Sequence, residues 1–429
     1  HALVAQNYAT ATTSHNVAVG SQAGANISTG IQNVFVGSLA GDALSASSYN
    51  TAVGYGALTD DTLGNRSTAI GYLALHNQNF TTATTSFNTA VGYNAGGEVT
   101  TGQSNTLMGD SAGDAITTGG LNTIIGTFAG SACSTVSNNT FVGAFCGDAA
   151  TSGDNTGVGS GALGGASNSA ANNVAVGKDA GNSVSTGTDN TFIGTQAGDG
   201  TDDGNNNTAV GSEALSANCG DANTAVGQFA LSVCTGADNT ALGTDAAAAL
   251  TSGSNNFFIG HDAGRTGSPG GNQTTGSNRG FMGDENITSI NAQVDITAAS
   301  DERDKTDFTA LDLGLDFVKA MKPYTFKWDK RSKYGDKKAD DYDLDAITTD
   351  GTHKEDWLDL GFKAQDVKAL EEASNYKIAD KTNLTVSVTD DGKQYGMRYA
   401  KLVPILVKAI QELSAKNDAL EARIATLEG

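Results

Sequence analysis

Asn50-Thr51-Ala52-Val53-Gly54, followed by Ala57-Leu58, is one copy of a unit that repeats through most of the chain. Its glycine recurs sixteen times, and nine of the fifteen intervals between successive glycines are 17 residues long. The glycines are Gly20, Gly37, Gly54, Gly71, Gly92, Gly109, Gly126, Gly143, Gly159, Gly177, Gly194, Gly211, Gly227, Gly243, Gly260 and Gly283. A fixed period of this kind is typical of stacked coils. We therefore predict a β-solenoid, with loop insertions in the two long intervals before Gly92 and Gly283.

A short β-strand is predicted immediately before the glycine of each unit. The residue before the glycine is always Val, Ile, Leu or Met, and an apolar residue such as Ala or Phe stands two before it. Successive side chains of a strand point to opposite faces, so both faces of this strand are apolar. We expect one face to pack inside the coil and the other against a neighbouring layer or chain.

An asparagine stands four residues before the glycine in 14 of the 16 units, the exceptions being Ser67 and Arg279. Examples are Asn16 before Gly20, Asn33 before Gly37 and Asn50 before Gly54. Stacked asparagine side chains can form hydrogen bonds from one rung to the next and tolerate turn conformations. The glycine permits a backbone geometry that a Cβ atom would block. Together they predict a corner that is repeated in every rung.

The composition changes near residue 299. Residues 1–299 hold 4 of the 25 Lys+Arg and 21 of the 47 Asp+Glu, a net charge of −17, whereas the remaining residues hold 21 and 26, a net charge of −5. Two structural units are therefore expected, and the acidic segment argues against binding to nucleic acids or anionic membranes. There is no run of about 18 apolar residues, so no membrane insertion is expected. Because the chain begins at His1, we expect it to be a fragment or a processed product.

All four cysteines lie in the repeat segment. Cys219 and Cys234 fall at almost the same phase of adjacent units, where neighbouring rungs bring side chains within disulfide reach, and we predict a bond between them. Cys146 replaces a small alanine and is expected to be a buried, inert thiol. No metal site and no cofactor are expected. Aspartates that follow the Ala-Gly pair suit calcium, but we interpret them as solvated turn carboxylates. They are Asp42, Asp114, Asp148 and Asp199.

The sequence after residue 300 predicts a small α+β domain. Apolar spacing predicts a helix over 311–321, alternation predicts a strand over 324–328, a short helix is expected at 366–372, and Leu384 begins the first arm of a hairpin.

The last segment, from Lys401, has heptad spacing. Val403, Ile410, Asn417 and Ile424 fall on one core position, and leucines fall on the other at 406, 413, 420 and 427. This pattern predicts a coiled coil, in which Asn417 would fix register and stoichiometry. The alternative is an amphipathic helix that packs on its own domain.

The unit N-T-A-V-G-x-x-A-G resembles the head repeats of trimeric autotransporter adhesins, although those units are usually a few residues shorter. That resemblance covers nearly all of residues 16 to 264. It implies a β-roll with three chains side by side.

Three further motifs resemble the endosialidase-type intramolecular chaperone of phage tail fibres and tail spikes. They are Ser300-Asp301-Glu302-Arg303-Asp304-Lys305 with the segment up to Trp328, Leu360-Gly361-Phe362-Lys363-Ala364-Gln365-Asp366-Val367, and Tyr399-Ala400-Lys401-Leu402-Val403-Pro404-Ile405-Leu406. The resemblance implies a trimeric helper domain that aligns three chains and then releases itself by autoproteolysis. Transferred by motif, Ser300 is the nucleophile, Lys305 the base and Ala299-Ser300 the cleaved bond. A serine and a lysine five residues apart would otherwise indicate only a solvated turn.

The expected protein is mainly β, with a β-roll or β-solenoid rod over 1–290, a junction over 291–299, a chaperone domain over 300–400 and a coiled-coil helix over 401–429. We expect a homotrimeric fibre for host-surface adhesion, most simply in the virion tail. Its expected partners are a host cell-surface receptor and an upstream tail or baseplate component. The alternatives are a bacterial surface adhesin and a carbohydrate-degrading tail spike. No enzyme that turns over a substrate is predicted, apart from a serine endopeptidase that acts once on its own chain.

Overall fold

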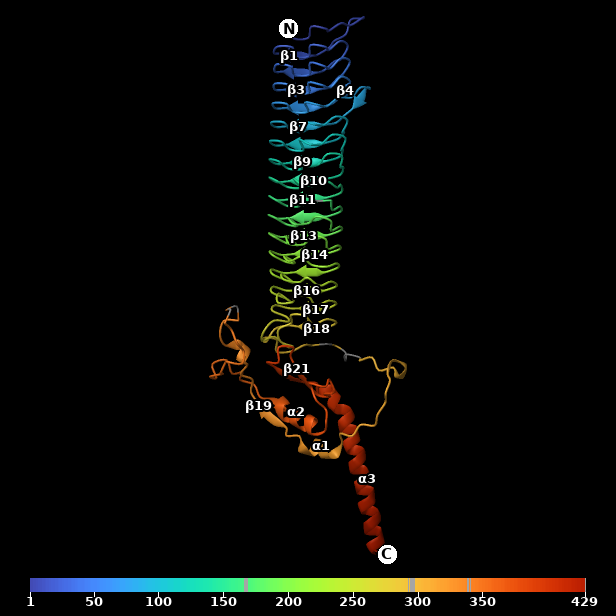
Figure 1. Ribbon diagram of the computed structural model, residues 1–429, viewed down its shortest axis with the longest axis vertical. Coiled ribbons are helices and arrows are strands. Elements are labelled where there is room, and N and C mark those ends of the chain that lie inside the picture. Colours follow the sequence, from blue (N-terminus) through green and yellow to red (C-terminus); the bar gives the residue numbers. More distant parts are fainter. Residues whose placement is uncertain (166–168, 292, 294–297, 338, 340, 429) are drawn as a thin grey trace. The chain divides into compact units, whose positions relative to one another are not determined.

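The computed structural model describes residues 1–165, 169–291, 293, 298–337, 339 and 341–428. The chain divides into two compact units, one formed by 1–262 with 274–280 and the other by 263–273 with 281–429. The first unit is a stack of rungs, and the second is a smaller assembly of helices and short strands (Figure 1). The predicted junction over 291–299 lies largely outside the described residues.

Sixteen three-residue strands form one continuous sheet, one strand per rung. They are β1 (Val17–Val19), β2 (Val34–Val36), β3 (Thr51–Val53), β5 (Thr68–Ile70), β7 (Thr89–Val91), β8 (Thr106–Met108), β9 (Thr123–Ile125), β10 (Thr140–Val142), β11 (Thr156–Val158), β12 (Val174–Val176), β13 (Thr191–Ile193), β14 (Thr208–Val210), β15 (Thr224–Val226), β16 (Thr240–Leu242), β17 (Phe257–Ile259) and β18 (Gly280–Met282). Neighbours pair in parallel at equal repeat positions, as where Thr123 of β9 faces Thr140 of β10. The mainly β, solenoid fold is confirmed.

The long interval before Gly92 leaves this stacking intact, as predicted. Strand β5 pairs directly with β7 in repeat register, so Thr68 faces Thr89. The additional residues lie beside the sheet, where β4 (Gly64–Asn65) pairs with β6 (Thr84–Thr85).

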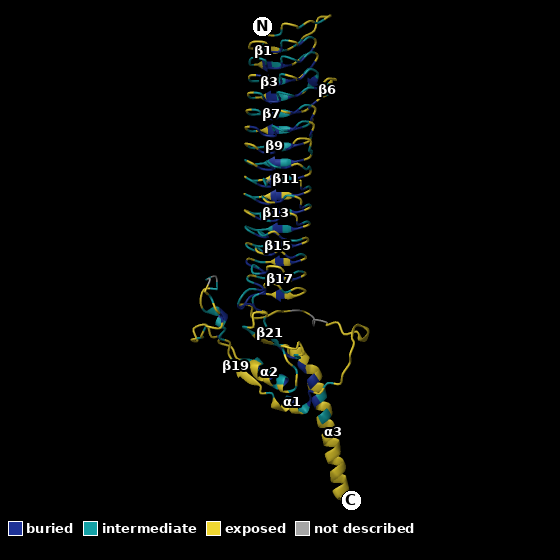
Figure 2. Ribbon diagram, viewed as in Figure 1, coloured by how far each residue is buried: buried dark blue, intermediate teal, exposed yellow. Residues whose placement is uncertain are grey.

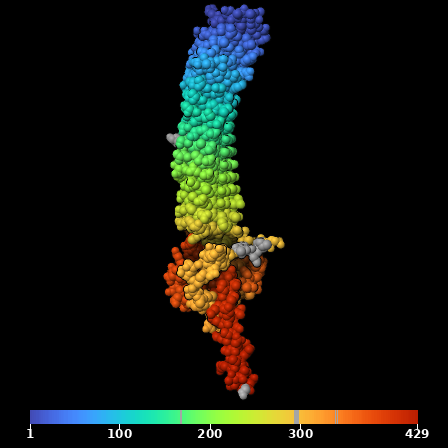
Figure 3. All heavy atoms as spheres, turned by 90° about the vertical axis from the view of Figure 1, so that its right-hand side faces the viewer, coloured from blue at the N-terminus to red at the C-terminus, as the bar shows by residue number. Residues whose placement is uncertain are grey.

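The two faces of the sheet have opposite environments (Figure 2). Side chains two before the glycine point inward, and the largest of them, Phe35, Phe141, Phe192 and Phe258, have no exposed surface. Side chains directly before the glycine point outward; Val19, for example, is 60% exposed. Figure 3 shows the rungs of the first unit packed directly on one another. One sheet face of this unit therefore carries exposed apolar side chains in a single chain.

The repeat glycine is required by both conformation and space. Gly109, for example, has φ of +137°, a value that side-chain-bearing residues rarely adopt. A Cβ atom on Gly109 would lie 2.6 Å from the carbonyl oxygen of Gly126 in the next rung. The glycines thus allow the corners of successive rungs to approach closely.

The asparagines form the predicted ladder. The backbone N–H of Asn139 donates to Oδ1 of Asn122 at 3.0 Å, and Oδ1 of Asn139 accepts from the backbone N–H of Asn155 at 3.0 Å. The Asn139 amide group also donates to the carbonyl oxygen of Ser152 at 3.2 Å. Each side chain therefore satisfies a backbone donor of the next rung, and these asparagines are buried from Asn33 to Asn256.

The gap at Ser67 is filled by a residue from the insertion. Gln78 donates to Ser67 Oγ at 2.8 Å and accepts from the amide of Asn88 at 2.8 Å, so it connects the two sides of the gap. Its amide also donates to Oδ2 of the buried Asp61 at 2.6 Å. Burial raises the pKa of Asp61, while the bond from Gln78 acts in the opposite direction. The other exception, Arg279, has no acceptor in its side chain and therefore ends the ladder.

The second unit contains the predicted helices and strands. Its elements are η1 (Glu302–Asp304), α1 (Leu315–Ala320), β19 (Tyr324–Phe326), η2 (Arg331–Lys333), β20 (Asp359–Gly361), α2 (Ala364–Ala373), β21 (Val386–Val388), β22 (Tyr395–Met397), η3 (Tyr399–Lys401) and α3 (Leu402–Glu428). Strands β19 and β20 pair antiparallel, as do β21 and β22. The core of this unit combines α1, α2, β21 and the first turns of α3, with the segment before α1. Its buried members are Leu313, Phe317, Val367, Val386, Leu402 and Ile405.

Two glutamates form hydrogen bonds between different elements of this unit. Glu371 of α2 is buried and accepts from the backbone N–H of Thr385 at 2.6 Å. Glu412 of α3 accepts from the backbone N–H of Leu315 at 2.7 Å and so caps α1, a bond that lowers the pKa of Glu412. Of the described helices, none combines the length and apolar character needed to cross a membrane.

Replacing Asn139 by alanine tests the ladder. The N–H of Asn155 would lose its buried acceptor, so the free energy of unfolding should fall by about 1–3 kcal/mol. Amide exchange at Asn155 should accelerate more than at distant rungs. The exposed Gln103→Ala variant is the control and should leave both quantities nearly unchanged. Equal stability of the two variants in denaturant titrations would contradict a structural role for the ladder.

Candidate functional site

Ser300 and Lys305 lie close together in the second unit, in the segment that precedes α1. The Nζ atom of Lys305 lies 2.6 Å from Ser300 Oγ and 3.0 Å from the carbonyl oxygen of Ser300. The predicted nucleophile and base are therefore within hydrogen-bond distance, which is the geometric requirement for proton transfer between them. Their catalytic roles, and cleavage of the Ala299-Ser300 bond, remain predictions.

A single 3-10 turn produces this proximity. Asp301 precedes η1, and its carboxylate accepts from the backbone N–H of Arg303 at 2.9 Å, an arrangement typical of an N-cap. The turn closes where the backbone N–H of Lys305 donates to the carbonyl oxygen of Glu302 at 3.1 Å. The chain thereby reverses within five residues, so Lys305 reaches back to Ser300.

The acidic neighbours are partly neutralised by Arg303. Its guanidinium donates two bonds to the Asp301 carboxylate, from Nε to Oδ1 at 3.0 Å and from Nη2 to Oδ2 at 2.6 Å. These bonds lower the pKa of Asp301 and raise that of Arg303. Arg303 thus neutralises Asp301, one of the three acidic residues in the turn.

The environment of the pair is open. Ser300, Lys305 and the whole turn between them are exposed in the single chain. A lysine accepts a proton only in its neutral form, which burial or neighbouring positive charge favours. The single chain therefore supplies the geometry of a serine–lysine pair without burying it.

Residues 300–374 match a family model described as chaperone of endosialidase. The match includes the first two of the three motifs that carry the sequence resemblance and ends before the third, at 399–406. Neither the curated proteins nor the solved structures contain a match to the chain. The predicted endosialidase-type chaperone region at the C-terminus is confirmed by the family match, and the repeats before it form the predicted solenoid.

The predicted disulfide between Cys219 and Cys234 is not formed in the structure, where both are free, buried thiols. Each sulfur has a different neighbour: Cys219 Sγ lies 3.3 Å from Thr201 Oγ1, whereas Cys234 Sγ accepts from the Asn239 amide at 3.5 Å. Phase along the repeat places the residues on adjacent rungs, but this alone does not bond the two sulfurs. Cys146 is a free, buried thiol as expected.

Several aspartates occupy positions that suit cations. Asp42, Asp114, Asp148 and Asp199 each have one buried carboxylate oxygen without a hydrogen-bond partner among the described residues. Burial raises the pKa of all four, so they are less solvated than predicted. Asp245, His261 and Asp262 place ligand atoms within 4.8 Å of one another. None of these groups by itself establishes a metal site.

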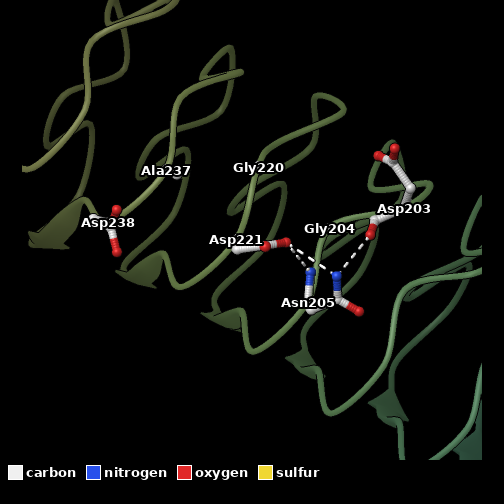
Figure 4. Close-up of a pocket in the computed structure, with 7 residues that line it drawn as sticks. All are labelled: Asp203, Gly204, Asn205, Gly220, Asp221, Ala237 and Asp238. Atoms are coloured by element: carbon white, nitrogen blue, oxygen red, sulfur yellow. Dashed lines mark hydrogen bonds between the residues drawn. The ribbon is translucent and has the colours of Figure 1, made fainter.

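A shallow surface pocket crosses three rungs near Asp203, Asp221 and Asp238 (Figure 4). Within it, Oδ1 of Asp221 accepts from the backbone N–H of Asn205 at 2.8 Å and from its amide at 3.1 Å. This bond is one step of a second, less regular ladder, six residues before the glycine, in which Ser48 Oγ also accepts from the N–H of Ile31 at 3.1 Å. The pocket is therefore formed by the regular stacking of rungs and by the hydrogen bonds between them.

Two aromatic stacks were missed by the sequence analysis. Tyr55, Tyr72 and Tyr93 directly follow the glycines of three successive rungs, and Arg66 lies between the rings of Tyr49 and Phe87. Aligning the units by their glycines would have placed each set in one column. The remaining predicted residue, Asn417, donates to Glu421 Oε1 at 3.0 Å within α3, and its role in coiled-coil register stays a prediction.

Cleavage can be tested by a denaturing gel of the full chain. We expect fragments of 299 and 130 residues, the second being 429 − 299, and a single full-length band for Ser300→Ala and for Lys305→Met. Lys319→Met removes an exposed lysine of α1 and is the matched control, which should still be cut. An uncut wild type, or two bands for Ser300→Ala, would contradict the assignment.

Thiol chemistry tests the cysteines. Burial raises the pKa of Cys133 and Cys146 to about 12 and that of Cys234 to about 11. Little thiolate is present near neutral pH, so native alkylation should be slow and unfolding should expose four reactive thiols per chain. Intact mass should not change on reduction. A gain in mass of two hydrogens on reduction would instead show that a disulfide is present and would support the predicted Cys219–Cys234 bond.

Proposed function

We propose that this protein is a homotrimeric fibre for adhesion to a host surface, carried in a virion tail, whose C-terminal unit aligns the three chains. The solenoid would be the fibre, and the region similar to the chaperone of endosialidase would be its assembly device. Cleavage at Ala299-Ser300 would release that device after assembly. The proposed partners are a host receptor and an upstream tail or baseplate component.

The observation that carries this proposal is the apolar heptad face of α3. Ile410 is 66% exposed, Leu413 55% and Leu427 84%, so the core positions of four heptads remain uncovered by their own chain. Only the first turns of the helix, at Leu402, Ile405 and Ala409, are buried. A helix packed on its own domain would hide this face, whereas a coiled coil between chains covers it.

The outward face of the solenoid supports association along the fibre. Exposed apolar side chains precede the glycines on rung after rung, including Val19, Ile193 and Leu242. A contiguous apolar surface of this kind on a secreted or virion protein is typical of a protein interface. If the outward sheet faces of three copies packed together, these exposed apolar side chains would be buried, as the apolar face of α3 would be in a coiled coil.

The rungs create a need for an alignment device. Adjacent strands carry nearly the same side chains, so three solenoids can associate in registers that differ by one rung with little difference in contact energy. A coiled coil at the end of the chains has a single polar core position, at Asn417, which specifies its register. Fixing the helices first would then fix every rung.

Assembly also accounts for the exposed serine–lysine pair. A charged lysine cannot accept a proton from a serine, whereas a lysine buried away from water is more readily neutral. Burial of the turn between chains would favour neutral lysine and leave the short Ser300–Lys305 contact ready for proton transfer. Cleavage would then follow trimer formation.

Light scattering of purified chains tests the trimer. Leu420→Glu places a charge on the heptad face and should convert the trimer to monomer or aggregated chains at micromolar concentration. Ala422→Glu adds the same side chain two residues away, on the opposite face, and is the matched control. A monomeric wild type, or an unchanged trimer in the Leu420 variant, would reject the coiled-coil assembly. Adsorption of the trimer to candidate host cells then tests adhesion separately.

A further inference from the structure

The rungs that end at Gly54, Gly71 and Gly92 differ from the others at one repeat position, five residues before the glycine. Tyr49, Arg66 and Phe87 occupy it in succession. The central carbon of the Arg66 guanidinium lies 5.5 Å from the centre of the Tyr49 ring and 5.8 Å from that of Phe87, within the range of cation–π attraction. The cation is therefore held between two rings of neighbouring rungs.

This position is conformationally unfavourable for bulky side chains. Tyr49, Arg66 and Phe87 have φ of 64°, 60° and 52°, in the left-handed region. Eight other rungs carry asparagine or aspartate there, which tolerate this region best. They are Asn138, Asp154, Asn172, Asp189, Asn206, Asp238, Asn255 and Asn278. The other five rungs carry His15, Gln32, Ser104, Leu121 and Ala222 there, with φ between 50° and 61°, so the fold imposes this conformation on every rung. Tyr49, Arg66 and Phe87 are distinguished by the contacts between a cation and two rings that they form across three rungs.

The guanidinium is available to a ligand. Arg66 is exposed, and its side chain has no hydrogen bond or ion pair among the described residues. Rings of two neighbouring rungs flank the guanidinium, and its N–H groups remain open to a carboxylate, which an arginine can bind with two parallel bonds.

Tyrosines extend the same surface on the other side of the strands. The rings of Tyr55 and Tyr72 are 5.4 Å apart and those of Tyr72 and Tyr93 5.3 Å, and all three are about half exposed. Each of these tyrosines belongs to the same rung as Tyr49, Arg66 or Phe87 and follows the strand that the other residue precedes. A row of phenol hydroxyls thus accompanies the arginine.

The charge around these rungs complements an anion. Residues 45–97 contain two acids, Asp60 and Asp61, of the 21 in residues 1–299, and Asp61 is fully buried. Elsewhere in the solenoid, Lys178 is paired with Asp179 at 3.3 Å. An anionic ligand therefore meets less repulsion at Arg66 than along the rest of the fibre.

We propose that Tyr49, Arg66 and Phe87, together with the Tyr55–Tyr72–Tyr93 row, bind a carboxylate-bearing saccharide. This deepens the proposed host adhesion and rests on it, by assigning the adhesive rungs and the ligand class. The sugar's carboxylate pairs with the Arg66 edge, its hydroxyls bond to the tyrosine hydroxyls, and its C–H surfaces contact the exposed ring edges. An acidic saccharide supplies all three groups, whereas an acidic peptide supplies mainly the first.

Surface-immobilised full-length protein tests this with defined polymers. The probes are polygalacturonate, neutral dextran and polyglutamate, at low ionic strength because exposed charge pairs are screened by salt. Polygalacturonate should bind best, and Arg66→Asn should weaken it by about tenfold, consistent with loss of a bidentate pair. Asparagine is the residue that other rungs carry at this position, so the variant should fold. Arg66→Lys retains the charge without the planar fork and should bind with intermediate affinity.

Lys178→Gln, which removes an exposed cation on a distant rung of the solenoid, should bind as the wild type does. Four results would overturn the site: polygalacturonate bound no better than dextran, polyglutamate bound equally well, unchanged binding by Arg66→Asn, or a changed oligomeric state of that variant, which would make the stack a contact between chains. If the wild type remains a trimer and adsorbs to cells in any of these cases, the proposed fibre stands and only this site fails.

Discussion

The stacking of the solenoid depends on one repeated hydrogen bond, from the backbone N–H four residues before a glycine to the asparagine oxygen of the preceding rung, which is interrupted among the described rungs at Ser67. A three-residue strand cannot satisfy its own backbone groups or bury its own side chains. Asn139 solves the first problem by accepting from Asn155, and the inward phenylalanines and alanines solve the second. Because each rung obtains both from its neighbours, stability is shared between adjacent rungs, and a rung in isolation has no stable fold.

The same dependence explains why the exceptions are informative. Serine at 67 is too short to span the step to Asn88, which lies beyond the inserted residues. Gln78 enters from the insertion and joins the two, and it also donates to the buried carboxylate of Asp61. The insertion is thus tied into the core of the stack. The same rungs carry Arg66 between the rings of Tyr49 and Phe87 on the outer surface. The buried exception at Ser67 and the exposed exception at Arg66 therefore occur in the same rung.

The sequence was sufficient to predict the features that depend on the spacing of the repeat. It was not sufficient for those that depend on the orientation of individual side chains. Spacing of the glycines predicted the rungs, the asparagine column predicted its ladder, and the heptads predicted α3 within one residue of its start. Counting from the glycine also placed Cys219 and Cys234 on adjacent rungs, but the orientation of each thiol follows from local packing against Thr201 and Asn239. Gln78 could not be foreseen because its role arises from where a loop returns. The family match came from residues 300–374, which carry no repeat at all.

The solenoid is built from nearly identical rungs, whereas the second unit is built from elements that differ from one another. Each unit supplies a property that the other lacks. A stack whose rungs are interchangeable gains a stable core from few residue types, but it lacks any feature that distinguishes one alignment of two stacks from the next. The second unit has such features, because Glu371 and Glu412 accept hydrogen bonds from particular backbone N–H groups and the core combines different elements. Ser300 and Lys305 lie at the start of that segment, in contact but exposed. On the proposed trimer, the burial that favours neutral lysine arises from the alignment itself, so cleavage would report that alignment has been completed.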